Sequence, residues 1–80
     1  MSQLNTLSEL GKKIRKLRAT KNLTQEELAA SSKLDRSYIS GIERGLRNPT
    51  VATLCDIAQV LGVPVANLFV FTKNDQQSND

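Results

Sequence analysis

Five polar or small residues near the middle of the chain recur at one-, four-, five- and eight-residue steps, which places them on one face of a predicted helix: Arg36, Ser37, Ser40, Gly41 and Arg44. Ile39 and Ile42 fall on the opposite face, where we expect them to enter a core. An arginine early in such a helix can donate two parallel hydrogen bonds to O6 and N7 of guanine, and serine hydroxyls reach bases or phosphates. This face is suited to reading double-stranded DNA; a plain solvated helix face is the alternative.

Further residues around this face extend the same chemistry. Gly41 costs roughly 1 kcal/mol relative to alanine inside a helix, which indicates that another group approaches closely there. Gln25 is expected near a helix N-terminus, where it would hold a phosphate or reach a base edge, or be an ordinary exposed glutamine. Arg47 and Asn48 follow the helix and would contact the DNA backbone or groove edge, or serve only as loop residues. Tyr38 is expected either to pack on a neighbouring helix or to send its hydroxyl toward a phosphate, and we favour packing.

Local signals predict two short helices joined by a tight turn over this stretch. Thr24 and Glu27 form a Thr-x-x-Glu capping box, which starts the first helix. Asp35 starts the second only a few residues later, with Leu34 and Ile39 at the spacing of a hydrophobic staple. Two helices this close, the second with a polar outer face, form the unit that many regulators insert into the DNA major groove.

Two charged residues are expected to be structural. Arg18 and Glu43 lie on the inward sides of their predicted helices, where an isolated charge would be expensive, so we predict that they form an ion pair.

No pattern in the sequence indicates catalysis. Cys55 is accompanied by no histidine and no second cysteine, so it builds neither a zinc site nor an activated nucleophile, and we expect it to be a small buried or interfacial side chain. Paired carboxylates, a phosphate-binding loop and a catalytic triad are also missing from the sequence. We therefore expect a protein that is not an enzyme and that needs no cofactor or metal.

Composition and charge support one small domain with a polyanionic partner. The chain has 80 residues, is 39% hydrophobic and 24% charged, and carries a formal net charge of +3. The lone cysteine fits a reducing compartment, and no apolar run reaches membrane-spanning length, so we expect a cytoplasmic protein and no membrane partner. Positive charge is concentrated in two segments, one with Arg36, Arg44 and Arg47 and the other with Lys12, Lys13, Arg15, Lys16, Arg18 and Lys21. Such an uneven distribution is typical of nucleic-acid binders.

The apolar spacing predicts a compact all-α domain of five helices. They are expected to begin at Leu7, Thr24, Asp35, Thr50 and Pro64. Asn22 and Gly62 suit the left-handed positions that end the first and fourth of these. We expect a frayed N-terminus over residues 1–6, a DNA-binding and dimerisation domain over residues 7–71, and a disordered polar tail over residues 72–80.

The apolar end of the domain is richer than its own core requires. We predict a dimer interface built from Val65, Leu68, Phe69 and Phe71. Packing within one monomer is the alternative.

These residues resemble a known family. TQEELAASSKL followed by DRSYISGIERG and NPT is similar to the phage-repressor-like helix-turn-helix family, also called the Cro/C1 or XRE family, over roughly residues 7–71. Within it, LDRSYISGIER is especially similar to controller proteins of restriction–modification systems. The resemblance implies a lambda-repressor-like five-helix fold, a homodimer joined mainly through the last helices, and inverted-repeat operators.

The resemblance also assigns roles to individual residues. It implies that Arg36, Ser37, Ser40 and Arg47 lie at the DNA, that Gln25 lies at the phosphate-facing start of its helix, and that Arg18 pairs with Glu43. The chain departs from the family pattern in the turn. Lys33 stands where glycine is frequent, and Ser32 stands where a more apolar residue is common.

The predicted function is sequence-specific DNA-binding transcription regulation by a homodimer, with the control of a restriction–modification operon as the favoured setting. Repression would occlude RNA polymerase and activation would touch it; the sequence does not choose between them. The alternative is an antitoxin or anti-repressor whose main partner is another protein, held by the apolar C-terminal end.

Overall fold

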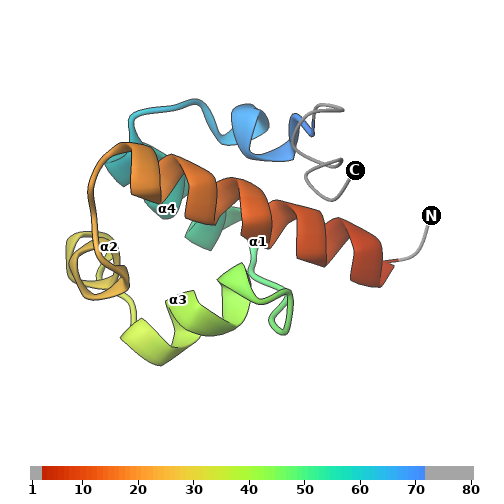
Figure 1. The fold of residues 1–80 in the computed structure, drawn as a ribbon, viewed down its shortest axis with the longest axis horizontal. Helices are drawn as coiled ribbons and strands as arrows, with labels where there is room; N and C mark the ends of the chain where they lie inside the picture. The colour runs from red at the N-terminus through yellow and green to blue at the C-terminus, as the bar shows by residue number, and fades with distance from the viewer. Residues whose placement is uncertain (1–2, 72–80) are drawn as a thin grey trace.

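The computed structural model describes residues 3–71, which form four α-helices and one 3-10 helix with no β-strand among them (Figure 1). The elements are α1 (Gln3–Thr20), α2 (Gln25–Ser32), α3 (Arg36–Glu43), α4 (Val51–Leu61) and η1 (Val65–Phe69). The all-α prediction is confirmed for this part of the chain. The predicted fifth helix is instead a 3-10 helix that follows Pro64, a tighter helix that proteins use in short runs and as a connector. The tail over residues 72–80 lies outside the described residues.

Helix α1 is longer than its apolar spacing predicted. It begins at Gln3, so residues 3–6, which we expected to be frayed, are helical. Extending an existing helix adds one hydrogen bond per residue ordered, which explains why this polar start continues the helix. At the other end Asn22 has a φ of 59°, and the N–H of Leu23 donates to the carbonyl of Arg18 at 3.1 Å. Asn22 therefore ends α1 in the left-handed conformation predicted for it.

The turn between α2 and α3 has the left-handed geometry that glycine usually supplies. Lys33 adopts φ 61° and ψ 42°, and the N–H of Leu34 returns to the carbonyl of Ala29 at 2.8 Å. Ser32 is buried, and its hydroxyl donates to the carbonyl of Leu28 at 2.6 Å, which satisfies a polar group at an apolar position. Both departures from the family pattern are thus accommodated locally.

N-terminal caps were predicted for α2, α3 and α4, and their side-chain hydrogen bonds form in α2 and α4. The Thr24 hydroxyl accepts from the N–H of Glu27 at 3.0 Å, and the Glu27 carboxylate accepts from the N–H of Thr24 at 2.9 Å. Thr50 caps α4 through its hydroxyl alone, which accepts from the N–H of Thr53 at 3.1 Å. Asp35 occupies the N-cap of α3, but its carboxylate makes no capping hydrogen bond to the first turn of that helix.

The core lies where α1 crosses the other helices. In Figure 1 α1 runs across the front, with α3 on one side, η1 on the other and α4 behind. α1 contacts α3 and η1, whereas α2 contacts α3 and α4. The largest fully buried side chains are Ile14, Leu28, Ile39, Ile42, Ile57, Leu61 and Leu68. At the crossing of α1 and α3, a Cβ on Gly11 would overlap the carbonyl oxygens of Ile42 and Glu43, so the two backbones touch there.

Cys55 lies on the exposed side of α4, so of the two alternatives expected for it, burial in the core is wrong, and a role at an interface stays a prediction. Neighbouring Leu54 and Ile57 occupy the inward positions of that helix instead. Within residues 3–71 no helix combines the length and the apolar character needed to cross a bilayer.

Candidate nucleic-acid interface

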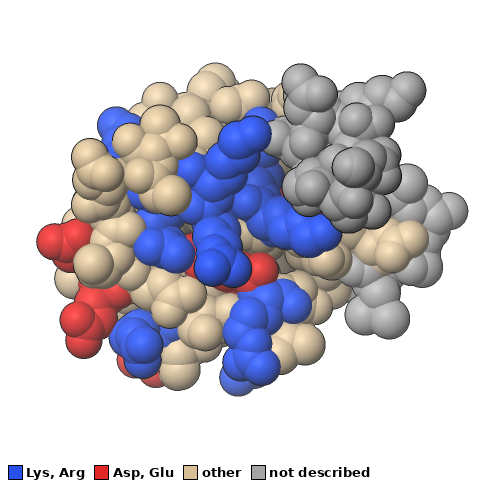
Figure 2. All heavy atoms as spheres, in the orientation of Figure 1, with Lys and Arg blue, Asp and Glu red and all other residues tan. Residues whose placement is uncertain are grey.

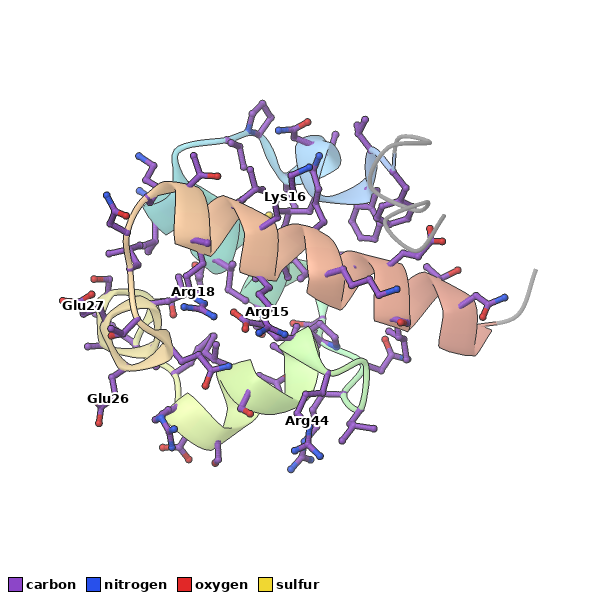
Figure 3. The ribbon with its side chains drawn as sticks, viewed as in Figure 1. Arg15, Lys16, Arg18, Glu26, Glu27 and Arg44 are labelled. Atoms are coloured by element: carbon purple, nitrogen blue, oxygen red, sulfur yellow. The ribbon has the colours of Figure 1, made fainter. Side chains whose placement is uncertain are left out.

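The outer face of α3 carries the residues predicted to read DNA. Arg36, Ser37 and Arg44 are exposed, and Ser40 is half-buried. Arg36 is the first residue of the helix, and Figure 3 shows Arg44 projecting from the other end, away from α1. Because Ile39 and Ile42 are buried on the opposite side, the core fixes which face of α3 points outward.

Gly41 also belongs to the outer side of α3, but it is buried. A Cβ built on Gly41 would lie 2.7 Å from Cγ and 3.2 Å from Nε of Arg47. The close approach that this glycine predicted is therefore made by an arginine of the same chain. The Arg47 side chain therefore covers Gly41 on the side from which DNA would approach.

Arg47 also covers Tyr38. Its Cζ lies 6.0 Å from the centroid of the Tyr38 ring, within the range of a cation–π contact. Tyr38 is half-buried, so it packs within the domain as expected, but its partner is the loop arginine as well as the core. Asn48, the next loop residue, is exposed, and Pro49 after it is buried.

The end of α3 determines where this loop goes. Gly45 has a φ of +75°, its N–H donates to the carbonyl of Ile42 at 3.0 Å, and the N–H of Leu46 donates to the carbonyl of Gly41 at 2.8 Å. This pair of backward hydrogen bonds is a Schellman cap, and its left-handed residue favours glycine. The cap reverses the chain so that residue 47 returns along the side of α3.

Arg18 and Glu43 form the predicted ion pair, at the junction of α1, α2 and α3. Arg18 Nε donates to Glu43 Oε2 at 2.7 Å, and Arg18 Nη2 donates to Glu43 Oε1 at 3.1 Å. The side chains are only 15% and 2% exposed. Arg18 Nη1 also donates to the carbonyl of Leu23 at 2.7 Å, which ties the pair to the connection between α1 and α2.

Gln25 joins this network, which the sequence did not indicate. Its Nε2 donates to Glu43 Oε1 at 3.0 Å. One of its two amide N–H groups is therefore used inside the protein, and the contact with a phosphate or a base edge stays a prediction. The position of Gln25 at the first residue of α2 is as expected, and its backbone N–H lies at the positive end of that helix. Only the packing of α2 on α3 brings Gln25 within reach of Glu43.

Two open recesses flank the first turn of α3. One, of about 470 Å³, is lined by residues that include Arg18, Gln25 and Arg36. The other, of about 590 Å³, is lined by the turn between α2 and α3 together with Tyr38 and Arg47. Each recess therefore has an arginine from the predicted reading surface on its wall.

Positive charge spreads beyond α3. Figure 2 shows Lys and Arg side chains gathered on the face that carries α1, with acidic groups toward α2, where Figure 3 labels Glu26 and Glu27. Figure 3 places Arg15 on the side of α1 that faces α3, and Lys16 on the side that faces η1. Arg15 therefore extends the positive surface of α3 onto α1. The cluster of cations was visible in the sequence, but its orientation depends on how α1 crosses α3.

Of the residues predicted to form a dimer surface, Leu68 is buried in the core, whereas the neighbouring Val70, which was not among them, is exposed. Leu68 is 0% exposed and belongs to the core, whereas Phe69 and Val70 are 44% and 48% exposed. In a 3-10 helix residues three apart share a face, so Val65 and Leu68 both turn inward and Phe69 turns out. Val65 and Phe71 pack against the core while remaining partly exposed, and the rings of Phe69 and Phe71 meet edge to face at 6.4 Å.

Comparison with known proteins places the chain in a family. A sequence-family model described as helix-turn-helix matches residues 14–68, which include all of α2, α3 and α4. Control protein C.BamHI of Bacillus amyloliquefaciens is 44% identical over 63 residues, which cover 78% of this chain and 78% of that protein.

Solved structures agree in fold over most of the chain. The restriction-modification controller protein C.AhdI from Aeromonas hydrophila matches with a TM-score of 0.78 and 43% identity, over 79% of this chain and 96% of that one. SinR, the master regulator for biofilm formation, crystallised in complex with DNA, matches with a TM-score of 0.73 and 35% identity, over 76% of this chain and 98% of that one. The chain therefore belongs to the XRE-type helix-turn-helix family of transcriptional regulators and is similar to the controller proteins of restriction–modification systems.

Proposed function

We propose that the protein binds inverted-repeat operators as a homodimer and inserts each α3 into the major groove of one half-site. One observation supports the proposal most: α3 exposes Arg36, Ser37 and Arg44 on its outer side. The inner side of the helix is held by the core and by the ion pair of Glu43. The likeness to SinR, solved with DNA, supports the same mode of binding.

The contacts divide into those that read bases and those that hold phosphates. Arg36 starts α3, where a recognition helix meets base edges, and its guanidinium suits guanine O6 and N7. Ser37 and Ser40 add hydroxyls on the same side. Arg44, at the end of α3, and the backbone N–H of Gln25, at the start of α2, are placed to hold phosphates.

The dimer surface is proposed at the end of the described chain. Phe69 and Val70 are large hydrophobic side chains with about half of their surface exposed, and Val65 and Phe71 continue the patch toward the core. A second copy of the chain seated there would bury this apolar surface and would present a second α3. A two-fold dimer needs two half-sites, with centres about 34–36 Å or a multiple apart on DNA.

Control of a restriction–modification operon is the proposed biological setting, because C.BamHI and C.AhdI are named as controllers of such systems. Binding over a promoter would repress it by occluding RNA polymerase. Binding beside a promoter would activate it through contact with polymerase.

Footprinting on the DNA upstream of the protein's own gene tests this proposal. We expect protection of two symmetric half-sites at moderate salt, with centres one or more helical turns apart. Affinity should fall steeply as salt rises, because phosphate contacts release counterions. Absence of protection at moderate salt, together with co-purification of a stable heteromeric protein partner, would overturn the proposal.

A further inference from the structure

We propose that Gly41 and Tyr38 form a cradle that holds the Arg47 side chain against α3, so that Arg47 is a preorganised part of the DNA-reading surface. Gly41 is then a positioning residue that acts through Arg47 and makes no contact with DNA itself. This inference rests on the proposed DNA-binding function and assigns a further specificity determinant within it.

Contacts along the whole Arg47 side chain define the cradle. A Cβ on Gly41 would meet Cγ, Nε and Cδ of Arg47 at 2.7, 3.2 and 3.5 Å, so the arginine stem crosses directly over the glycine. Beyond the stem, the guanidinium lies over the Tyr38 ring at 6.0 Å. Tyr38 and Gly41 are three residues apart on α3 and are therefore neighbours on its surface. Together they support both the apolar and the charged part of one side chain.

The backbone delivers Arg47 to this cradle. The Schellman cap at Gly45 turns the chain back, and its hydrogen bond from Leu46 N–H ends on the carbonyl of Gly41 itself. On the far side of Arg47, Pro49 is buried and Thr50 caps α4. The loop is therefore anchored on both sides of Arg47, one residue before it and two residues after it.

A held arginine binds DNA better than a free one. Immobilising a long side chain on binding has an entropic cost, and a side chain that is already ordered in the free protein avoids most of it. Any Cβ at position 41 would displace Cγ of Arg47 and release the guanidinium from Tyr38. This explains why a poor helix former occupies the middle of α3.

The substitution Gly41→Ala separates this role from stability. Alanine is the better helix former, and the atoms that it displaces belong to an exposed side chain, so we expect an unchanged Tm or a rise of a few degrees. Operator affinity should nevertheless fall by about 2- to 10-fold, the effect of ordering one long side chain on binding. A stabilised variant that binds less well is not expected from a purely structural role.

A double-mutant cycle provides the test. The probe is a DNA duplex selected by the wild-type protein from a random pool, and affinity and base preference are measured for wild type, Gly41→Ala, Arg47→Ala and the double variant. We expect Gly41→Ala and Arg47→Ala to relax base preference at the same position of each half-site, and the double variant to bind like Arg47→Ala alone. Additive losses would show that the alanine methyl obstructs DNA directly, and would overturn the cradle.

Tyr38 offers a second, independent measurement. Tyr38→Phe keeps the ring, so it should preserve base preference at the Arg47 position, whereas Tyr38→Leu should relax it. Equal behaviour of the two variants at that position would contradict the cradle. Ala30→Gly, on the exposed side of α2, is the matched control: it lowers helix propensity and should lower Tm without relaxing base preference.

The outcomes distinguish the cradle from the proposed function. If the wild-type protein selects an inverted repeat but the losses in the double-mutant cycle are additive, the proposed function is supported and the cradle is refuted. A wild-type protein that selects no sequence overturns both.

Discussion

Removing Arg18 should destabilise the domain more than removing any exposed cation. Arg18→Ala deletes two hydrogen bonds to the Glu43 carboxylate, at 2.7 and 3.1 Å, and one to the carbonyl of Leu23 at 2.7 Å. The Glu43 side chain is only 2% exposed, so its charge would stay buried and would keep the hydrogen bond from Gln25. Hydrogen bonds to charged groups contribute about 1.5–3 kcal/mol each, and breaking a buried pair from one side costs about 3–5 kcal/mol.

We therefore expect Arg18→Ala to lower the free energy of unfolding by about 3–5 kcal/mol, a large share of the 5–15 kcal/mol typical of a whole domain. In a domain of this size the Tm should fall by at least about 12 °C. Urea denaturation followed by circular dichroism measures the first quantity, and a thermal scan measures the second. Arg15→Ala removes the same charge from an exposed position of α1, and should change stability by no more than about 0.5 kcal/mol.

The double variant Arg18→Met, Glu43→Leu tests the physical reason. If the loss comes from an uncompensated buried charge, apolar replacement of both partners should recover more than half of it. A loss below about 1 kcal/mol for Arg18→Ala would mean that the pair behaves as a solvated surface pair. A double variant no more stable than Arg18→Ala would refute the argument from buried charge.

Three further predictions concern reading, assembly and packing. Arg36→Ala should cost about 1–3 kcal/mol of discrimination at one position per half-site in binding to systematically varied operators, and unchanged preference at every position would remove Arg36 from the reading surface. Phe69→Asp should yield a folded monomer in analytical ultracentrifugation, whereas Leu68→Asp should unfold the domain because that side chain is fully buried; a folded Phe69→Asp dimer would refute the proposed interface. Gly11→Ala should lower the free energy of unfolding, measured by urea denaturation, by about 1–3 kcal/mol, because the methyl would press on the backbone carbonyl of Ile42. A neutral effect would show that α1 and α3 separate easily.

Signals that act within a few residues predicted the helix boundaries well. The Thr24–Glu27 capping box and the Thr50 cap are formed by side chains and N–H groups three residues apart. Asn22 and Gly62 take left-handed conformations that depend on their own backbone preferences. Both partners of such an interaction lie within a few residues of each other, so a short stretch of sequence is enough to predict it. The same locality explains why Ile39 and Ile42 were assigned correctly to the inner face of α3.

Errors arose where a residue's neighbours come from another segment. Leu68 was assigned to an interface because its apolar character cannot show which way a 3-10 turn will face. Gly41 was expected to admit DNA, although Arg47 from the following loop already lies over it. Gln25 was expected at a phosphate or base edge, or as an exposed glutamine, and its hydrogen bond to Glu43, 18 positions later in the chain, was not foreseen. In each case the sequence singled out the residue but did not show which segment of the fold it would contact.

The sequence by itself determined the limits of α2, α3 and α4, the buried faces of the helices and the arginine-bearing surface of α3, because capping chemistry and apolar spacing act over three or four residues. The pairing of Arg18 with Glu43 could also be inferred, since two inward charges need each other. Only the tertiary structure decided that Gln25 completes that pair, that Arg47 lies across Gly41 and Tyr38, and that Phe69 rather than Leu68 faces out. These outcomes depend on the angle at which one element packs against another, which no short stretch of the chain specifies.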